Sequence, residues 1–206
     1  LAHLLDRLAE KNVPVIMALR GDPPQGETTF RSHPQGFSHA SELIGFIKKG
    51  WPQFRIGCAA YPEGHPESCA ADGTRLPERD MEFLKLKQDQ GADFAVTQMF
   101  FDNAVYERFV EQAQAANISM PLLPGVMPLN SASQIERFVT LAGCAIPERL
   151  RQAASEEDVV EAGYAFALDQ CRNLLKSGAP GIHLYTLNQS AQSGRLAAAL
   201  REEGLL

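Results

Sequence analysis

The stretch best equipped for chemistry is the segment 59–67, which reads Ala-Ala-Tyr-Pro-Glu-Gly-His-Pro-Glu. Its two prolines fix their own φ angles and disfavour helix in the residues before them, so we expect a stiff loop. Three uses fit these residues: a ligand site with Tyr61 stacking and His65 donating, a metal site with Cys69 beside His65, and a rigid structural turn. The ligand site is favoured, because the ligand spacing is not that of a closed metal site.

A second polar group, Arg20-Gly21-Asp22, directly follows an apolar run. Glycine lets the backbone approach a ligand closely, and the two charged side chains could face a phosphate or a polar heterocycle. A salt-bridged turn explains the same residues equally well. Both interpretations stay open on these residues alone.

Single polar residues mark the ends of two further apolar runs. Gln98 stands among apolar neighbours, so its amide must be hydrogen-bonded if buried or must face a ligand. Tyr185 and Asn188 end the last apolar run in a similar way. Asp80 and Lys87 instead lie two turns apart on a predicted helix, a pattern typical of an exposed charged face.

The elements that must position these residues alternate between apolar strands and periodic helices. The apolar runs are continuous, and the run at 13–19 is expected to be buried on both faces. Ser38, Asp102 and Ser131 are the predicted N-caps of three helices. The predicted strands are 13–19, 54–60, 94–100, 121–126 and 181–187. The predicted helices are 2–12, 38–49, 79–90, 103–116, 132–142, 147–153, 155–177 and 191–203.

This order predicts an α/β protein with a parallel sheet. An open doubly wound sheet and part of a (β/α)8 TIM barrel both remain, and both place sites at the carboxyl ends of strands. The barrel is favoured because polar residues follow all five predicted strands. These residues are Asp22, Tyr61 with His65, Gln98, Asn130, and Tyr185 with Asn188.

The totals limit the class of protein. The chain has 206 residues, which predicts a single domain over 1–206, and a net charge of −6, which argues against nucleic-acid or anionic-membrane binding. The spacing of its four cysteines favours reduced thiols in a cytosol. The chain begins at Leu1 inside a helical pattern, so we expect it to be a piece of something longer.

Five motifs, in order and across most of the chain, closely resemble the methylenetetrahydrofolate reductase family. They are Ala-Leu-Arg-Gly-Asp-Pro at 18–23, the 59–67 loop, Thr-Gln-Met-Phe-Phe-Asp at 97–102, Pro-Gly-Val-Met-Pro at 124–128 and Leu-Tyr-Thr-Leu-Asn at 184–188. The resemblance implies a (β/α)8 flavoprotein, an oxidoreductase of one-carbon and methionine metabolism in the cytoplasm. Such an enzyme passes hydride from NADH or NADPH to FAD and then to 5,10-methylenetetrahydrofolate.

The resemblance also implies roles for individual residues. Asp22 and Gln98 would be catalytic, with Asp22 holding the folate and tuning the flavin and Gln98 contacting folate and nicotinamide. Binding by Asp80 and Lys87 would overturn their exposed-face interpretation. The implied FAD contacts are Leu19, Arg20, Gly21, Asp22, His39, Ala40, Tyr61, His65, Asp80 and Lys87. The implied substrate contacts are Asp22, Gln98, Gln134, Phe138, Tyr185 and Gln189. The implied partners are folate and nicotinamide, with a homo-oligomer left open and no metal, nucleic acid or membrane.

Two departures from the family pattern qualify this interpretation. Gln189 stands where the family has an arginine that pairs with the folate glutamate tail, so this contact should be weaker. The family's general acid is a glutamate on the first barrel strand, and the chain starts after that region. We therefore expect the chain to hold the last five strand–helix units of the barrel and to be inactive alone in folate reduction.

Two alternatives accompany the reductase. One is a non-catalytic flavin- or folate-binding paralogue that has lost its acid. The other is a different flavin barrel, such as a proline dehydrogenase-like enzyme. The combination of Arg-Gly-Asp at 20–22 with Tyr-Pro-Glu-Gly-His-Pro at 61–66 argues against the second.

Overall fold

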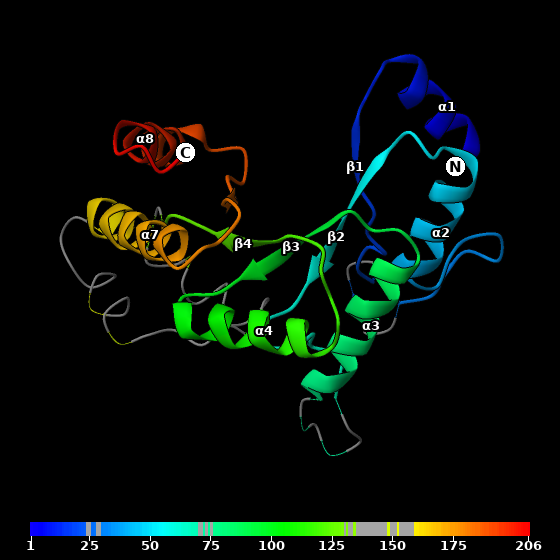
Figure 1. Cartoon of the computed structure of the whole chain (residues 1–206), viewed down its shortest axis with the longest axis horizontal. Helices are drawn as coiled ribbons and strands as arrows, with labels where there is room; N and C mark the ends of the chain where they lie inside the picture. Colours follow the sequence, from blue (N-terminus) through cyan, green and yellow to red (C-terminus); the bar gives the residue numbers. More distant parts are fainter. Residues whose placement is uncertain are drawn as a thin grey trace.

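Strands and helices alternate along the chain in the computed structural model (Figure 1), which describes residues 1–23, 26–27, 30–69, 72, 74, 76–129, 131, 134, 148, 152 and 159–206. The helices are α1 (Ala2–Glu10), α2 (Ala40–Gly50), α3 (Pro77–Asp89), α4 (Asn103–Ala115), α7 (Val159–Lys176) and α8 (Ser190–Glu202). The strands are β1 (Val15–Met17), β2 (Arg55–Ala60), β3 (Phe94–Met99), β4 (Leu122–Val126) and β5 (His183–Leu184).

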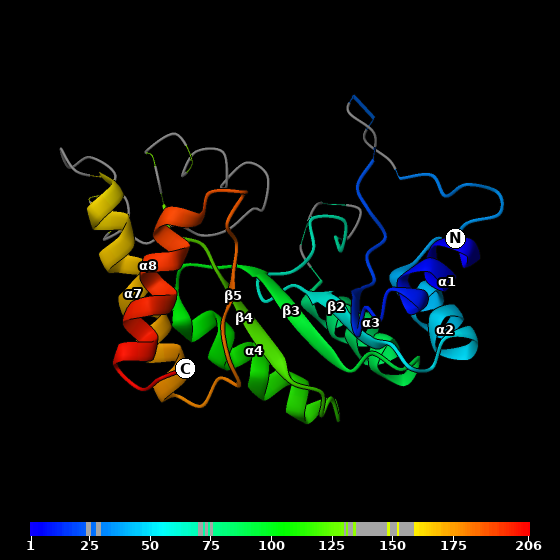
Figure 2. The same ribbon diagram turned by 90° about the horizontal axis from the view of Figure 1, so that it is seen from above.

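The five strands form one parallel sheet in the order β1-β2-β3-β4-β5. Each strand therefore pairs with its neighbour in the chain, whereas a doubly wound sheet reverses its order at a switch point. The sheet curls, and α2, α3, α4 and α7 follow its outer face (Figures 1 and 2). The expected parallel α/β fold is confirmed, and its form is a curled half-barrel of the TIM type.

The helix ends follow local hydrogen-bond chemistry. Asp102 caps α4 as predicted, because its carboxylate accepts the backbone N–H of Ala104 at 3.0 Å. The prediction that Ser38 opens α2 is wrong, since His39 is the N-cap. The Glu42 carboxylate accepts the N–H groups of both Ser38 and His39, at 2.7 and 3.1 Å, which fixes the start of the helix one residue later. No helix in the described ranges is both long and apolar enough to cross a membrane.

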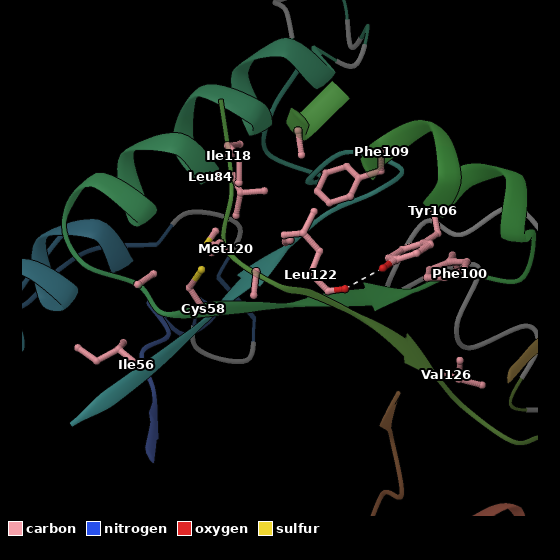
Figure 3. Close-up of a cluster of buried hydrophobic side chains, with 14 of the residues drawn as sticks. Ile56, Cys58, Leu84, Phe100, Tyr106, Phe109, Ile118, Met120, Leu122 and Val126 are labelled. Carbon is pink, nitrogen blue, oxygen red and sulfur yellow. Dashed lines mark hydrogen bonds between the residues drawn. The ribbon is translucent and has the colours of Figure 1, made fainter. Parts of the chain in front are cut away.

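The core lies between the sheet and the helices on its outer face (Figure 3). Strand residues Ile56 and Leu122 pack there with Leu84 of α3 and Phe109 of α4. The hydroxyl of Tyr106 donates a 2.7 Å hydrogen bond to the carbonyl of Leu122, which ties α4 to β4. Burial raises the pKa of Tyr106 to about 12, so the phenol stays protonated and keeps this bond.

The inner face of β1 is exposed, so the prediction that this strand is buried on both faces is wrong. Val15 and Met17 are 42% and 41% exposed, while Ala18 belongs to the core. Side chains alternate along a strand, and β1 lies at one end of the strand order with the helices on the other face. The apolar composition of β1 therefore does not show that both of its faces are buried.

Two further predictions need correction or lie outside what is described. The last strand is shorter than 181–187, because β5 pairs only at His183 and Leu184 before the chain turns. The predicted helices 132–142 and 147–153 lie largely outside the described residues, as does the start of the predicted helix 155–177. Asn130 and Phe138 lie outside them as well.

The Tyr106 bond generates a stability prediction. Tyr106→Phe should lower the free energy of unfolding by about 1–2 kcal/mol, because the Leu122 carbonyl loses a buried donor. Urea denaturation measures this change. Tyr164→Phe on α7 is the matched control, since that half-buried ring carries a cation–π contact from Arg195, which phenylalanine retains. Equal effects in both variants would contradict the assignment.

Candidate functional site

The loops that follow β1 and β2 are joined by a bidentate ion pair. Arg20 Nη1 and Nη2 donate to the two carboxylate oxygens of Glu67 at 2.6 and 2.8 Å. The hydrogen bond from Arg20 lowers the pKa of Glu67, and the same bond raises the pKa of Arg20. The salt-bridge interpretation of Arg20 is therefore correct in kind, although the pair links two loops and does not close a single turn.

Arg20 makes two further contacts. Its guanidinium lies over the Phe30 ring, 4.7 Å from the centroid, and its Nε donates to the Gly21 carbonyl at 3.3 Å. Gly21 has a φ of +86°, a conformation that favours glycine, and nothing lies within 4 Å of where a Cβ would stand. The backbone at Gly21 is thus open to a ligand, with the exposed Asp22 beside it.

Tyr61 and His65 lie against each other in the β2–α3 loop, which we define as residues 61–69. Their ring centroids are 4.5 Å apart in an edge-on arrangement. Burial and then the charge of Asp22 raise the pKa of Tyr61, which places Asp22 within electrostatic reach of the ring. Burial lowers the pKa of His65, and its Nδ1 accepts the Glu67 N–H at 3.1 Å, so a neutral imidazole fits.

Asp80 and Lys87 both turn from α3 toward this loop, so their exposed-face interpretation is wrong. Asp80 is 9% exposed, and its two oxygens accept the His65 N–H at 2.9 Å and the Ser68 hydroxyl at 2.7 Å. Lys87 donates to the Ala59 carbonyl at 2.8 Å, and burial lowers its pKa. The physical reason is that α3 packs on β2, and residues two turns apart share its inner face.

These residues form one group at the carboxyl ends of β1 and β2. The Lys87 ammonium lies 5.8 Å from the centre of the Tyr61 ring, which connects the helix to the aromatic pair. We call this group the loop cluster. Its members are Arg20, Asp22, Tyr61, His65, Glu67, Asp80 and Lys87.

A second group lies on β3, β4 and the end of β5. Tyr185 donates to the Thr97 carbonyl at 2.9 Å, and the Thr97 hydroxyl oxygen accepts the Gly125 N–H at 2.9 Å. A Cβ on Gly125 would stand 2.5 Å from the Tyr185 ring, so only glycine leaves room for it. Gln98 is half-buried next to Thr97, and its Oε1 accepts the Met99 N–H at 3.1 Å.

The remaining predicted site residues are placed around these two groups. His39 stacks on Phe83 of α3, with ring centroids 5.9 Å apart, and Ala40 begins α2. Leu19 is 53% exposed beside Arg20. Gln189 donates its N–H to the Thr186 carbonyl at 2.8 Å and is the N-cap of α8.

The last two predicted contacts belong to the segment after β4. Gln134 is half-buried, and its N–H donates to the Ser131 carbonyl at 3.2 Å. Phe138 lies outside the described residues.

Sequence reasoning gave no site role to Glu67, Thr97 or Gly125, although all three lie in motifs that it singled out. Glu67 carried a weak signal, because it ends a proline-fixed loop whose other polar residues were singled out. Gly125 carried a better one, since a glycine inside a strand indicates close approach by another group. Within the described residues, no group of three or more His, Cys, Asp or Glu side chains could hold a metal ion.

The fold and these two groups define a class of protein: a β/α half-barrel with its candidate site at the carboxyl ends of parallel strands. The chain belongs to the methylenetetrahydrofolate reductase family, whose sequence model matches residues 1–200. The family resemblance of the five motifs is thereby confirmed.

Relatives support the same assignment. The chain is 35% identical over 195 residues to methylenetetrahydrofolate reductase (NADH) 1 of Arabidopsis thaliana, covering 90% of this chain and 33% of that protein. It is 35% identical over 185 residues to 5,10-methylenetetrahydrofolate reductase of Salmonella typhimurium, covering 86% and 57%. The chain thus spans about a third of the plant relative and over half of the bacterial one.

A solved structure supports the fold. It is an uncharacterised protein from Clostridium thermocellum that binds two copies of 5-methyl-5,6,7,8-tetrahydrofolic acid. The two chains superimpose with a TM-score of 0.57 at 16% identity, covering 89% of this chain and 66% of the other. At 16% identity, this similarity shows only that the two proteins share a fold.

The lowered pKa of His65 generates a pH prediction. As the pH falls through the ordinary histidine value of about 6.5, the unfolded chain takes up a proton that folded His65 resists, so the free energy of unfolding falls. His65→Asn should reduce this loss between pH 8 and pH 6, as measured by urea denaturation.

His183→Asn is the comparison variant, because burial also lowers the pKa of His183. This variant should remove a separate part of the fall in the free energy of unfolding between pH 8 and pH 6. A His65→Asn variant with the same pH dependence as the parent would refute the assignment to His65.

Proposed function

We propose that this chain carries FAD- and folate-binding parts of a methylenetetrahydrofolate reductase, which reduces 5,10-methylenetetrahydrofolate to 5-methyltetrahydrofolate with NADH or NADPH. The observation that carries the proposal is that the loop cluster and the second group, made of Thr97, Gln98, Gly125 and Tyr185, lie on neighbouring strands of one parallel sheet in a chain of this family. Relatives named as NADH-dependent and NADPH-dependent reductases support either nicotinamide.

The residues of the loop cluster fit a flavin dinucleotide. Gly21 offers an open backbone, and the exposed apolar side chain of Leu19, two residues earlier in the chain, is suited to a flat ring system. Lys87 has three N–H donors, of which one goes to the Ala59 carbonyl, so a phosphate oxygen could accept another. FAD bound here supplies the hydride transfer chemistry that amino-acid side chains lack.

The chain's own residues bind and orient the reactants. The exposed Asp22 carboxylate would accept N–H donors of the folate pterin ring, and its negative charge lies near Tyr61. Gln98 uses its oxygen for the Met99 N–H, and its amide NH2 would donate to folate or nicotinamide. Tyr185, held over Gly125, would form a flat wall of the substrate site.

Three residues of the loop cluster, Tyr61, His65 and Glu67, do not fit the role of supplying the proton that folate reduction requires. Burial keeps the Tyr61 phenol protonated, and His65 is held neutral with Nδ1 as an acceptor. Glu67 is ionised and committed to Arg20. We therefore assign these three residues to cofactor binding and electrostatics, and leave folate binding to Asp22.

The test uses the protein expressed from its native reading frame. We expect a flavin absorbance spectrum, anaerobic bleaching by NADH or NADPH, and return of the absorbance on adding 5,10-methylenetetrahydrofolate. Bound flavin that neither nicotinamide bleaches would favour the non-catalytic paralogue. A protein that binds no FAD would refute the cofactor assignment.

Asp22→Asn separates substrate binding from cofactor binding. We expect the folate-dependent return of absorbance to slow by roughly tenfold to a hundredfold, because a charged acceptor is lost, while FAD remains bound. Asp89→Asn, at the exposed end of α3, is the matched control and should leave this rate unchanged. Equal rates in the Asp22 variant and the parent would contradict the role of Asp22.

A further inference from the structure

A continuous series of contacts runs from α3 to the loop after β1. Buried Asp80 holds the N–H of His65 and the hydroxyl of Ser68, which fixes both sides of the segment 65–68. Within that segment, the Glu67 N–H donates to His65 Nδ1, which orients the residue that carries the carboxylate. The Glu67 carboxylate in turn accepts two parallel hydrogen bonds from Arg20. The loop after β1 is thereby connected to a rigid helix.

Three of the five N–H donors of the Arg20 guanidinium make hydrogen bonds within the protein. Its two terminal nitrogens donate to Glu67, its Nε donates to the adjacent carbonyl, and its face covers the Phe30 ring. A guanidinium has a fixed fork of donors, so a bidentate carboxylate leaves little of its charge for a second anion. The side chain of Arg20 is also mostly covered, at 20% exposure.

We infer that Glu67 is a positioning residue of the flavin site, and that Arg20 is its ion-pair partner and not a phosphate ligand. We call the Arg20–Glu67 ion pair the tie, because it joins the loop after β1 to the β2–α3 loop. Glu67 sets where Gly21 and Asp22 lie relative to Tyr61. The inference rests on the proposed FAD function for its ligand, but the tie itself is a property of the protein without FAD.

The first test is a double-mutant cycle on FAD affinity, measured by quenching of flavin fluorescence. Glu67→Gln and Arg20→Gln should each weaken FAD binding by about fivefold, and the double variant should be no weaker than either, because one interaction is lost in all three. The visible absorption bands of bound flavin should shift in each variant, since Asp22 moves. If Arg20 were a phosphate ligand, Arg20→Gln would weaken binding far more, and Glu67→Gln would strengthen it.

The matched control is another bidentate pair, Arg172 with Glu203, which joins α7 to the end of α8 on a different part of the molecule. Glu203→Gln should leave both the FAD affinity and the flavin bands unchanged. A loss of affinity equal to that of Glu67→Gln would show a general stability effect and would overturn the positioning role.

The second test needs no FAD and separates the inference from the proposed function. Amide hydrogen exchange of the segment 19–22 should be faster by about fivefold or more in Glu67→Gln than in the parent, and unchanged in Glu203→Gln. Unchanged exchange in Glu67→Gln would overturn the inference even if FAD binds. Faster exchange would support the tie even if the parent binds no FAD and the proposed function fails.

Discussion

Parallel pairing of each strand with its neighbour in the chain is the constraint on which this molecule depends. It forces every chain reversal through a helix on the outer face and delivers every following loop to one edge of the sheet. Arg20 and Glu67 are far apart in sequence, yet the register that sets Val15 opposite Arg55 carries their loops to the same place. Strand order and register therefore determine which residues come together at the candidate site, and side-chain chemistry then determines how those residues interact.

Buried charges hold the loop cluster together, and each is matched by polar partners. An ionised carboxylate or ammonium loses much hydration energy on burial unless donors or acceptors replace the water. Asp80 receives one backbone and one side-chain donor, and Lys87 gives a hydrogen to a strand carbonyl. These bonds fix the backbone of the β2–α3 loop on both sides of His65. The loop can therefore be rigid although it contains no helix or strand.

Local signals in the sequence predicted much of the fold and part of the site. Asp102 is both the predicted and the observed cap of α4, because capping depends on only three residues. The exposure of Val15 and Met17 could not be predicted, since it depends on which strand lies at the end of the sheet. The inward turn of Asp80 likewise follows from how α3 packs on β2, and charge spacing along a helix does not report this. The tie between Arg20 and Glu67 is set by strand register, which apolar runs leave undetermined.

The exposed apolar face of β1 is also a surface through which the chain can associate in concentrated solution. Val15 and Met17 lie on the exposed inner face of β1, and the exposed Leu19 follows two residues after the strand. In the described part of the chain β1 pairs on one side only, with β2. Such a strand presents exposed apolar side chains and unpaired backbone N–H and C=O groups, with which another extended segment can pair. These three side chains favour association of the chain, and its net charge of −6 opposes it. Substitution of one of these three residues by a charged residue should reduce this association.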